Sequence, residues 1–366
     1  MASHHPQAIA RLTPLGEALG AVEAQVKPVA PGRGPPAAGR VLAEDVAAPR
    51  RPEAAIALAD GWAISADDTL GAGGTSPTAL PRAPARIDAG QPMPPGADSV
   101  APLDAVQVTA AGAQALAAVF PGDGVLPVGG DAHVGEVLRR AGERLRLADV
   151  ATFTALGLPS LALRIPRVRL VPLRDEPLIA AAAQLIGADL ERRGALLRES
   201  GSLDNALNAA DADMIVGIGG TGTGRNDSSV AALRRDGRLV LHGLALSPGE
   251  TAAFGFAGDK PVLLLPGRLD AALAVWLTLG RLAADRLSGA KPVAEFVDTA
   301  RLTRKIASTV GITEFVPVTR DGRGAEPLAS RYLPLSALSR ADGYVLVPAE
   351  SEGYSAGAAV RVWPWP

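Results

Sequence analysis

Apolar residues near the start of the chain recur at the spacing of one helix face. They follow Thr13-Pro14, and a proline suits the first turn of a helix. We therefore predict an amphipathic helix that begins here. Further on, the segment 39–49 predicts a short helical turn that continues into a strand. The apolar positions of the helix face are Leu15, Leu19, Val22 and Val26.

Residues 53–126 show a different pattern, in which brief apolar runs are separated by Gly, Pro, Asp and Thr. Such spacing is typical of short strands joined by turns, and it predicts a small β domain without a long helix. Residues 127–166 then combine a turn-rich strand segment with a helix at 147–158. We expect that segment to join residues 1–52 in a discontinuous linker domain.

Residues 167–290 alternate strand-like runs with helix-like runs. This alternation predicts a three-layer α/β domain with a largely parallel sheet, whose last helix covers residues 270–289. Residues 291–366 return to short β-like runs and predict a small terminal β domain. The chain is therefore predicted to be a multidomain α/β protein with a helical linker domain and two small β domains.

Composition narrows the functions that such a fold could carry. A chain of 366 residues exceeds the size of about 250–300 residues at which one hydrophobic core stops growing, so several domains are expected. A formal net charge of −2 and an aromatic content of 4% argue against nucleic-acid binding. The longest apolar run, Ala271–Gly280, is too short to predict a membrane span. A sequence without cysteine excludes thiolate metal sites and fits a cytoplasmic protein.

The candidate ligand site is the segment 217–229, GIGGTGTGRNDSS, which has five glycines in its first eight positions. It lies between a predicted strand and a predicted helix, at the edge where sheets of this class bind ligands. Glycines let a backbone approach a ligand closely, and the free amides of a helix N-terminus favour an anion such as phosphate. The structural alternative is a tight turn with Asp227 or Ser228 as an ordinary helix N-cap.

The same segment contains a dinucleotide-binding pattern, because Gly217, Gly219 and Gly222 satisfy G-x-G-x-x-G after a strand. This pattern favours a nucleotide-dependent oxidoreductase. Two features weigh against it. The motif is not in the first βαβ unit of its domain, and Asp236, at the expected distance, lies in a turn rather than at a strand end. The hypothesis of a dinucleotide therefore ranks below that of a phosphorylated small molecule.

Several segments, spread in order along nearly the whole chain, point to one family. GGTGTGRND resembles the pterin-binding loop of molybdopterin-binding domains, and ADGWAISADDT resembles an Asp-Gly-Tyr-Ala segment with Trp62 in place of Tyr. The other segments are GRVLAEDVAAP, RIDAGQPMPPGADSV, VGGDAHVGEVLRRAGERL, LLLPGRLDAAL and ADGYVLVPAESEGYSAG. Together they resemble the molybdopterin molybdenumtransferases, the MoeA and gephyrin E-domain family. The resemblance implies molybdenum cofactor biosynthesis, in which molybdopterin or adenylylated molybdopterin is bound and molybdate is inserted with the help of Mg²⁺.

The resemblance also implies an elongated homodimer with an active cleft shared between protomers, and a molybdopterin-delivering protein and apo-molybdoenzymes as further partners. By motif position, it implies catalytic roles for Asp60, Asp131 and Asp227 and metal binding by Asp175 and Glu176. Without the resemblance, Asp60 and Asp131 are interpreted as turn residues. Asp175 and Glu176 are then interpreted as charges that the dipole of a helix N-terminus favours. The residues that the resemblance assigns to the pterin ligand are Gly219, Gly220, Thr221, Gly222, Gly224, Asp227, Ser247, Pro248, Gly249, Pro266, Gly267 and Arg268.

The chain departs from the family pattern at several polar positions of the expected cleft. Arg174 replaces a glycine, Ala89 replaces a threonine, and Ser247 and Glu250 replace two lysines. Loss of two cations from a site that gathers anions predicts slow or absent molybdate insertion, with Arg174 and Arg268 compensating in part. A non-catalytic carrier or assembly protein for molybdopterin or the finished cofactor is therefore the alternative to an active transferase.

Overall fold

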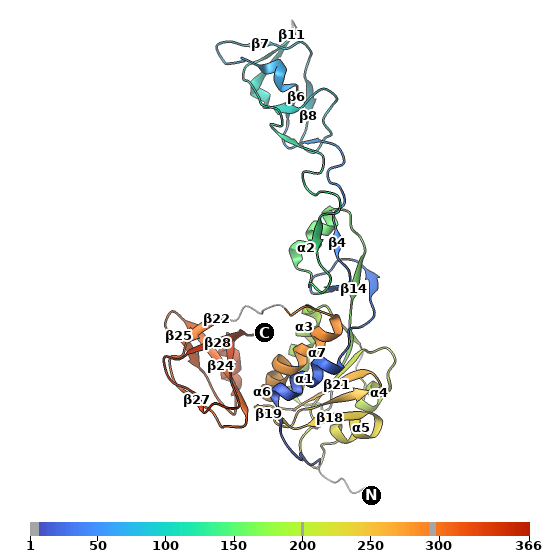
Figure 1. Cartoon of the computed structure of the whole chain (residues 1–366), viewed down its shortest axis with the longest axis vertical. Coiled ribbons are helices and arrows are strands. Elements are labelled where there is room, and N and C mark those ends of the chain that lie inside the picture. The colour runs from blue at the N-terminus through green and yellow to red at the C-terminus, as the bar shows by residue number, and fades with distance from the viewer. Residues whose placement is uncertain (1–6, 111, 199–200, 293–297) are drawn as a thin grey trace. The chain divides into compact units, whose positions relative to one another are not determined.

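The protein folds into two compact units, each formed by more than one stretch of the chain (Figure 1). The computed structural model describes residues 7–110, 112–198, 201–292 and 298–366. The first unit contains residues 1–44, 141–154 and 158–366, and the second contains residues 45–140 and 155–157. Along the chain, the second unit is therefore an insertion into the first. The division into four domains stays a prediction.

A six-stranded sheet forms the centre of the α/β part of the first unit. In spatial order, the first four strands pair in parallel, and each of the last two pairs antiparallel to the strand before it. The prediction of a largely parallel sheet is therefore confirmed for the four strands that precede helices. The strands, in spatial order, are β16 (Leu196–Arg198), β15 (Arg167–Pro172), β17 (Met214–Ile218), β21 (Lys260–Leu265), β20 (Ala253–Ala257) and β18 (Arg238–His242).

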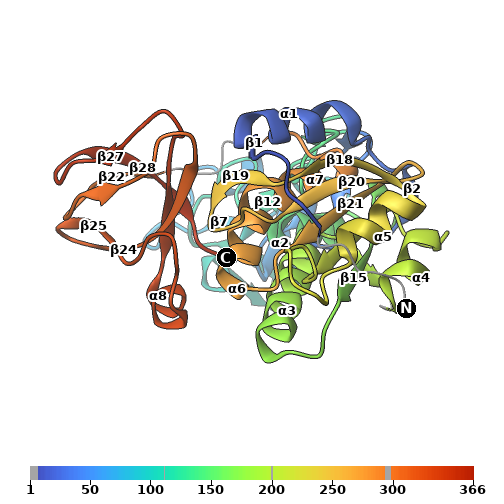
Figure 2. The ribbon, with the colours of Figure 1, turned by 90° about the horizontal axis from the view of Figure 1, so that it is seen from below.

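Helices cover both faces of this sheet (Figure 2). Successive residues of β17 point to opposite faces, so Met214 and Val216 join one buried cluster while Ile215 joins the other. Strands buried on both faces need the continuous apolar runs that the sequence has here. The three-layer prediction is thereby confirmed. One face carries α1 (Leu15–Gln25), α3 (Pro177–Arg192), α6 (Leu269–Val275) and α7 (Arg281–Ser288), and the other carries α4 (Leu203–Asn208) and α5 (Ser229–Asp236).

The helix predicted at 270–289 is not regular, because a π-helical turn, η3 (Trp276–Gly280), lies between α6 and α7. A Cβ atom on Gly280 would come within 2.3 Å of the Trp276 ring, so only glycine leaves room for the indole. That indole is fully buried, and its Nε1 donates a hydrogen bond of 2.9 Å to Asp189 of α3. The π-helical turn therefore places Trp276 against another helix. The local sequence pattern does not reveal this contact.

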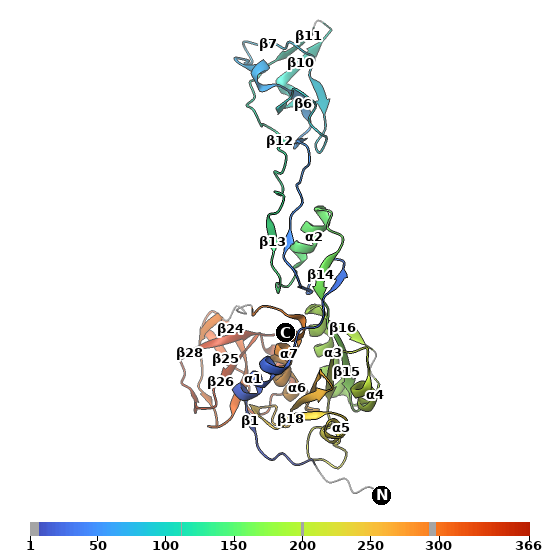
Figure 3. The same ribbon diagram turned by 45° about the vertical axis from the view of Figure 1, so that its right-hand side comes forward.

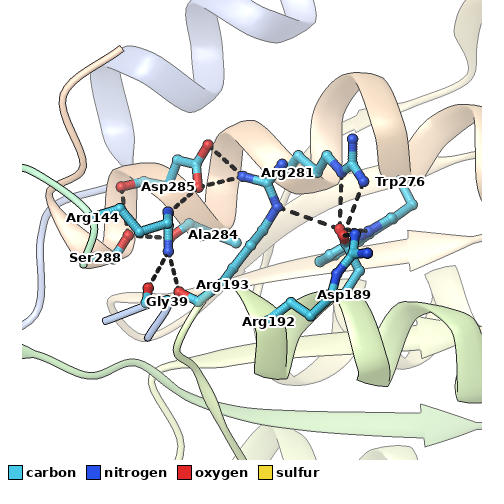
Figure 4. A network of polar contacts seen from close by, with 10 residues as sticks. All are labelled: Gly39, Arg144, Asp189, Arg192, Arg193, Trp276, Arg281, Ala284, Asp285 and Ser288. Carbon is cyan, nitrogen blue, oxygen red and sulfur yellow. Dashed lines mark hydrogen bonds and ion pairs between the residues drawn. The ribbon is translucent and has the colours of Figure 1, made fainter. Parts of the chain in front are cut away.

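Asp189 is the centre of a buried ion network (Figure 4). Its carboxylate is 3% exposed and accepts hydrogen bonds of 2.9 Å from both Nε and Nη2 of Arg281, in addition to the Trp276 indole. Burial by itself raises the pKa of Asp189, but the hydrogen bonds and charge of Arg281, with the charge of Arg193, hold that pKa well below its usual range. The carboxylate is therefore ionised and paired in the core.

The network continues to the segments that precede and follow the insertion. Arg193 donates to both oxygens of Asp285 at 2.8 Å, and Arg144 donates to Asp285 Oδ1 at 2.7 Å (Figure 4). Arg144 also donates to the backbone carbonyls of Gly39 and Arg193. The α/β layers and the linker segments of the first unit are thus joined by charge-assisted hydrogen bonds.

A second sheet joins the C-terminal strands to the α/β part. β19 (Leu244–Ser247) pairs in parallel with β24 (Thr313–Asp321), which sets Ser247 opposite Glu314. A residue expected to bind the ligand is thereby placed beside a buried carboxylate of the terminal strands. The other elements of this part are β1 (Thr13–Pro14), β22 (Asp298–Arg301), β23 (Ile306–Ala307), β25 (Gly324–Pro327), α8 (Leu335–Arg340), β26 (Gly343–Val347), β27 (Gly353–Tyr354) and β28 (Ala359–Pro364).

The linker segments contain α2 (Leu147–Ala155), which confirms the predicted helix, and a sheet of β2 (Gly32–Gly34), β14 (Leu161–Arg164) and β3 (Val41–Leu42). The helical turn predicted within 39–49 is wrong, because that segment holds β3 and β4 (Val46–Ala47) instead. Val41 and Leu42 are fully buried, and β3 pairs with β14. Long-range strand pairing therefore outweighs the local preference.

The second unit consists of short strands and turns (Figure 3). Apart from residue 111, which lies outside the described residues, the segment 53–126 contains two short 3-10 helices and no α-helix, as predicted. In the described parts of the whole chain, no helix combines the length and apolar character that crossing a membrane requires. Besides β4, the elements are β5 (Ile56–Ala57), β6 (Gly61–Ile64), η1 (Ala66–Thr69), β7 (Thr78–Ala79), β8 (Ala85–Ile87), β9 (Ser99–Ala101), η2 (Leu103–Ala105), β10 (Val106–Thr109), β11 (Gly112–Ala115), β12 (Val125–Leu126) and β13 (Val137–Arg139).

Candidate functional site

A pocket of about 260 Å³ lies where the parallel strands β15 and β17 end. Its wall combines the glycine loop between β17 and α5 with the residues that follow β15 and those that open α4. The carboxyl ends of parallel strands are the edge at which sheets of this class bind ligands. The polar side chains that line the pocket belong to Arg174, Ser202, Asp204, Asn226, Ser228 and Ser229.

The glycines of the loop have two distinct structural roles. Gly219 and Gly220 have φ angles of 102° and 67°, which side-chain-bearing residues rarely adopt. A Cβ atom on Gly222 would come within 2.8 Å of Asp227 Oδ2, so this glycine makes room for a carboxylate. Part of the glycine content thus serves the shape of the loop itself. The open backbone that results is also the form that a bound anion would need.

Asp227 is folded back into the loop instead of capping a helix. The N-cap position of α5 is Ser228, whose side chain makes no capping hydrogen bond. The Asp227 carboxylate accepts a hydrogen bond of 3.0 Å from the Gly224 amide through Oδ2, and its Oδ1 forms an ion pair with Arg174 Nη2. Ser228 therefore occupies one of the two predicted N-cap positions, but without a capping hydrogen bond from its side chain, and Asp227 is not the N-cap.

Arg174 stands between two of the carboxylates that were expected at the site. Besides its ion pair with Asp227, its Nη1 lies 3.6 Å from Glu176 Oε1. Glu176 is the N-cap residue of α3, and both Asp175 and Glu176 are exposed. In the described ranges, no group of three or more His, Cys, Asp or Glu side chains is arranged to hold a metal ion. The guanidinium of Arg174 faces Asp227 and Glu176, and the metal-binding roles of Asp175 and Glu176 stay predictions.

Gln7, which the sequence did not single out, holds the glycine loop from the N-terminal segment. Its side chain is 5% exposed, and its Nε2 donates to the carbonyls of Gly220 and Gly222 at 2.9 and 3.1 Å. Its Oε1 accepts a hydrogen bond of 2.7 Å from the amide of Ala231 in α5. One amide side chain thus fixes both the loop and the helix that follows it. No local motif around Gln7 signals this role.

Gln7→Ala is expected to lower the free energy of unfolding by about 1–3 kcal/mol, because three partly buried hydrogen bonds are lost. The amide of Ala231 should then exchange with solvent faster than in the wild type, as hydrogen exchange can measure. Gln25→Ala removes only an exposed hydrogen bond to Arg238 and is the matched control. Unchanged protection of Ala231 in the Gln7 variant would mean that the loop keeps its shape without the N-terminal segment.

His242 supports the other side of the loop. Its Nε2 lies 3.0 Å from the carbonyl oxygen of Thr221, and the residue is 8% exposed. Burial lowers the pKa of His242, and the hydrogen bond with Thr221 opposes that effect only in part. The neutral ring therefore donates to the loop through Nε2. The sequence alone indicates no role for His242.

The three segments that the resemblance assigns to the ligand meet at one edge of the sheet. The hydroxyl of Thr221 lies 2.9 Å from that of Thr251, which follows Ser247, Pro248 and Gly249. Residues 266–268 follow β21, and a Cβ atom on Gly267 would lie 3.5 Å from Gly219 Cα. These segments come together because the parallel strands β17 and β21 end at this edge and the antiparallel strand β20 begins there.

Negative charge gathers around the second and third segments. The guanidinium of Arg268 forms an ion pair with Asp270, in which Nε lies 3.1 Å from Oδ1. The same guanidinium lies over the ring of Tyr332. Burial raises the pKa of Glu314, and the nearby carboxylate of Glu250 raises it further. The cation expected to compensate for the missing lysines is thus already paired with a carboxylate.

Asp60 and Asp131 belong to the second unit, whereas Asp227 belongs to the first. Asp60 is exposed and accepts a hydrogen bond of 2.8 Å from the Ala89 amide through Oδ1, which joins two of the segments that resemble the family. Asp131 is also exposed and lies 3.6 Å from Arg51 Nε. Both carboxylates therefore stabilise turns of their own unit and remain accessible. Their catalytic roles stay predictions.

Comparison with known proteins gives matches along most of the chain. Residues 13–157 match the MoeA N-terminal region (domain I and II), residues 174–285 match a probable molybdopterin binding domain, and residues 299–365 match the MoeA C-terminal region (domain IV). A putative molybdopterin biosynthesis protein of Methanocaldococcus jannaschii is 26% identical over 367 residues, covering 89% of this chain and 90% of the relative. Molybdopterin molybdenumtransferase 2 of Mycobacterium tuberculosis is 26% identical over 378 residues, covering 89% and 93%.

Solved structures give the same picture of the fold. Two crystal structures of the molybdopterin biosynthesis MoeA protein from Pyrococcus horikoshii are similar to the chain, with TM-scores of 0.72 and 0.74 at 24% and 25% identity. Each comparison covers 97% of this chain and 100% of the other. The order of elements is thus that of a known multidomain architecture.

Proposed function

The chain belongs to the MoeA family of molybdenum cofactor biosynthesis proteins, and we propose that it binds molybdopterin at the glycine-loop pocket and transfers molybdate into it. The observation that carries this proposal is the meeting of three segments, 219–222, 247–251 and 266–268, at the edge where β17 and β21 end and β20 begins. An open glycine backbone, a guanidinium and several hydroxyl groups suit a ligand with a phosphate and a polar ring edge.

The residues of the chain supply binding and orientation. Arg174 offers guanidinium donors to a phosphate, and the hydroxyl groups of Ser228 and Ser229 line the same pocket. Gln7 and His242 hold the loop in one shape before the ligand arrives, which lowers the cost of ordering it on binding. No step of this proposal depends on a divalent cation, and delivery of the pterin as an adenylate is a further part of the proposal.

A carrier of molybdopterin is the second candidate, and one observation favours it. Glu250 lies near the buried Glu314, and Arg268 is already paired with Asp270, so the region expected to receive molybdate is rich in carboxylates. Carboxylates repel oxyanions at close range. We therefore expect molybdate insertion to be slow compared with relatives that carry lysines at positions 247 and 250.

Reconstitution of an apo-molybdoenzyme decides between these candidates. With molybdopterin adenylate, micromolar molybdate and the purified chain, the wild type should give slow activation. Ser247→Lys combined with Glu250→Lys is expected to raise the rate by about tenfold, because two cations return to an anion site. Binding of NADH or NADPH without binding of molybdopterin would overturn the whole proposal in favour of an oxidoreductase. A wild-type rate equal to that of an ordinary transferase would exclude the carrier.

We further propose a cytoplasmic homodimer in which Asp60 of one protomer completes the cleft of the other, a cleft that Asp131 also faces. The support is that both carboxylates are exposed and belong to the second unit, whereas the glycine loop belongs to the first. Light scattering at micromolar concentration should give twice the mass of the chain. A monomer that still binds and transfers would show that each chain holds a complete site.

A further inference from the structure

The guanidinium of Arg174 lies between the carboxylates of Asp227 and Glu176, and Glu176 is one of the two residues at which the family resemblance predicted a cation. It forms an ion pair with Asp227 Oδ1 through Nη2, and its Nη1 lies 3.6 Å from Glu176 Oε1. The other oxygen of Asp227 is taken by the Gly224 amide at 3.0 Å. Both oxygens of the best-placed carboxylate are therefore already engaged.

The same guanidinium also faces the pocket. The Arg174 side chain is 36% exposed, whereas that of Asp227 is 14% exposed, so solvent and ligand reach the cation more readily than the carboxylate. An arginine carries five N–H donors, and two carboxylate contacts leave donors for a phosphate. A divalent ion at Asp227 would stand beside a permanent positive charge, which disfavours its binding.

We propose that Arg174 takes the place of a divalent cation in this pocket, so that the chain binds the phosphate of its pterin ligand without a metal ion. The inference rests on the proposed function for the identity of the ligand. It extends that function, because it assigns the phosphate contact to a side chain and removes Mg²⁺ from the binding step. Arg174 neutralises Asp227 and presents its remaining donors to the anion.

The first test measures the affinity for molybdopterin by anaerobic calorimetry, in EDTA and in millimolar Mg²⁺. The wild type should bind equally well in both, within about twofold, because its cation is built in. Arg174→Ala should bind about tenfold or more weakly in EDTA and recover in Mg²⁺, because Asp227 becomes free to hold the ion. Arg323→Ala, which frees only the exposed Asp321 of a distant turn, should behave as the wild type. A wild-type affinity that falls about tenfold in EDTA would overturn the inference.

The second test does not depend on molybdopterin. Mn²⁺ binding, followed by electron paramagnetic resonance, should be at least about fivefold tighter for Arg174→Ala than for the wild type and for Arg323→Ala. Equal binding by all three proteins, or a tight site in the wild type, would contradict the exchange of metal for guanidinium. If molybdopterin binds to none of them, the proposed function fails, and the Mn²⁺ measurement still decides whether Arg174 blocks a metal site. Circular dichroism verifies that both variants are folded.

Discussion

Asp189→Ala is expected to lower the free energy of unfolding by about 3–5 kcal/mol, because it leaves the buried guanidinium of Arg281 without its counter-ion. Arg281 is 7% exposed, and both of its hydrogen bonds to Asp189 are 2.9 Å long. The same change removes the acceptor of the Trp276 indole in the π-helical turn. Urea unfolding, followed by tryptophan fluorescence, measures the loss.

Two comparisons make this prediction specific. Asp211→Ala breaks the pair with Arg169 at 2.8 Å, but that carboxylate is half exposed, so we expect a much smaller loss than for Asp189→Ala. Asp189→Asn keeps the shape of the side chain and removes the charge, so it should fall between the wild type and the alanine variant. A loss below about 1 kcal/mol for Asp189→Ala would mean that water or Asp285 compensates Arg281.

Acid should lower the free energy of unfolding of the wild type by protonating the Asp189 carboxylate. The pKa of Asp189 is lower in the folded protein than in the unfolded chain, where it is about 3.9. Its stabilising contribution is therefore fully present above that pH and is lost as the pH falls toward the folded pKa. Unfolding at several pH values between neutrality and pH 2 should show a smaller acid-induced loss for Asp189→Asn than for the wild type. An identical pH dependence would locate the acid sensitivity elsewhere.

Asp227→Ala is expected to weaken molybdopterin binding by about tenfold or more, which corresponds to about 1.4 kcal/mol or more. The carboxylate fixes the loop at the Gly224 amide and holds the guanidinium of Arg174 at the edge of the pocket. Without it, both the loop and the arginine gain freedom that must be lost again on binding. Anaerobic calorimetry gives the affinity, and urea unfolding shows how much of the effect is a loss of stability.

The loop offers its own control for this experiment. Asp236→Ala, at the far end of α5, removes a contact with Arg235 that lies away from the glycines. Its affinity for molybdopterin should equal that of the wild type. If Asp227→Ala also binds as the wild type does, Asp227 serves only the turn, and the ligand must contact the loop through backbone groups alone.

Local sequence patterns were sufficient to predict the three layers of the α/β part and the position of the glycine loop between a strand and a helix. Burial on a helix repeats about every 3.6 residues and on a strand every second residue, so both are visible in a short window. The alternation in 167–290, the short strands of 53–126 and the helix within 147–158 were all predicted from such windows. The turn predicted at 39–49 failed because Val41 and Leu42 pair with a strand far along the chain.

The contacts that shape the site needed the tertiary structure. Gln7 is 213 residues from Gly220, and Arg174 is 53 residues from Asp227, yet each pair forms a hydrogen bond. Composition and spacing identify Asp227, Glu176 and Arg174 as charged residues near strand ends, but they do not say which charges neutralise each other. That pairing depends on side-chain directions set by packing across the sheet edge. The sequence therefore indicates where a ligand site is expected, whereas folding decides that the guanidinium of Arg174 pairs with the Asp227 carboxylate there.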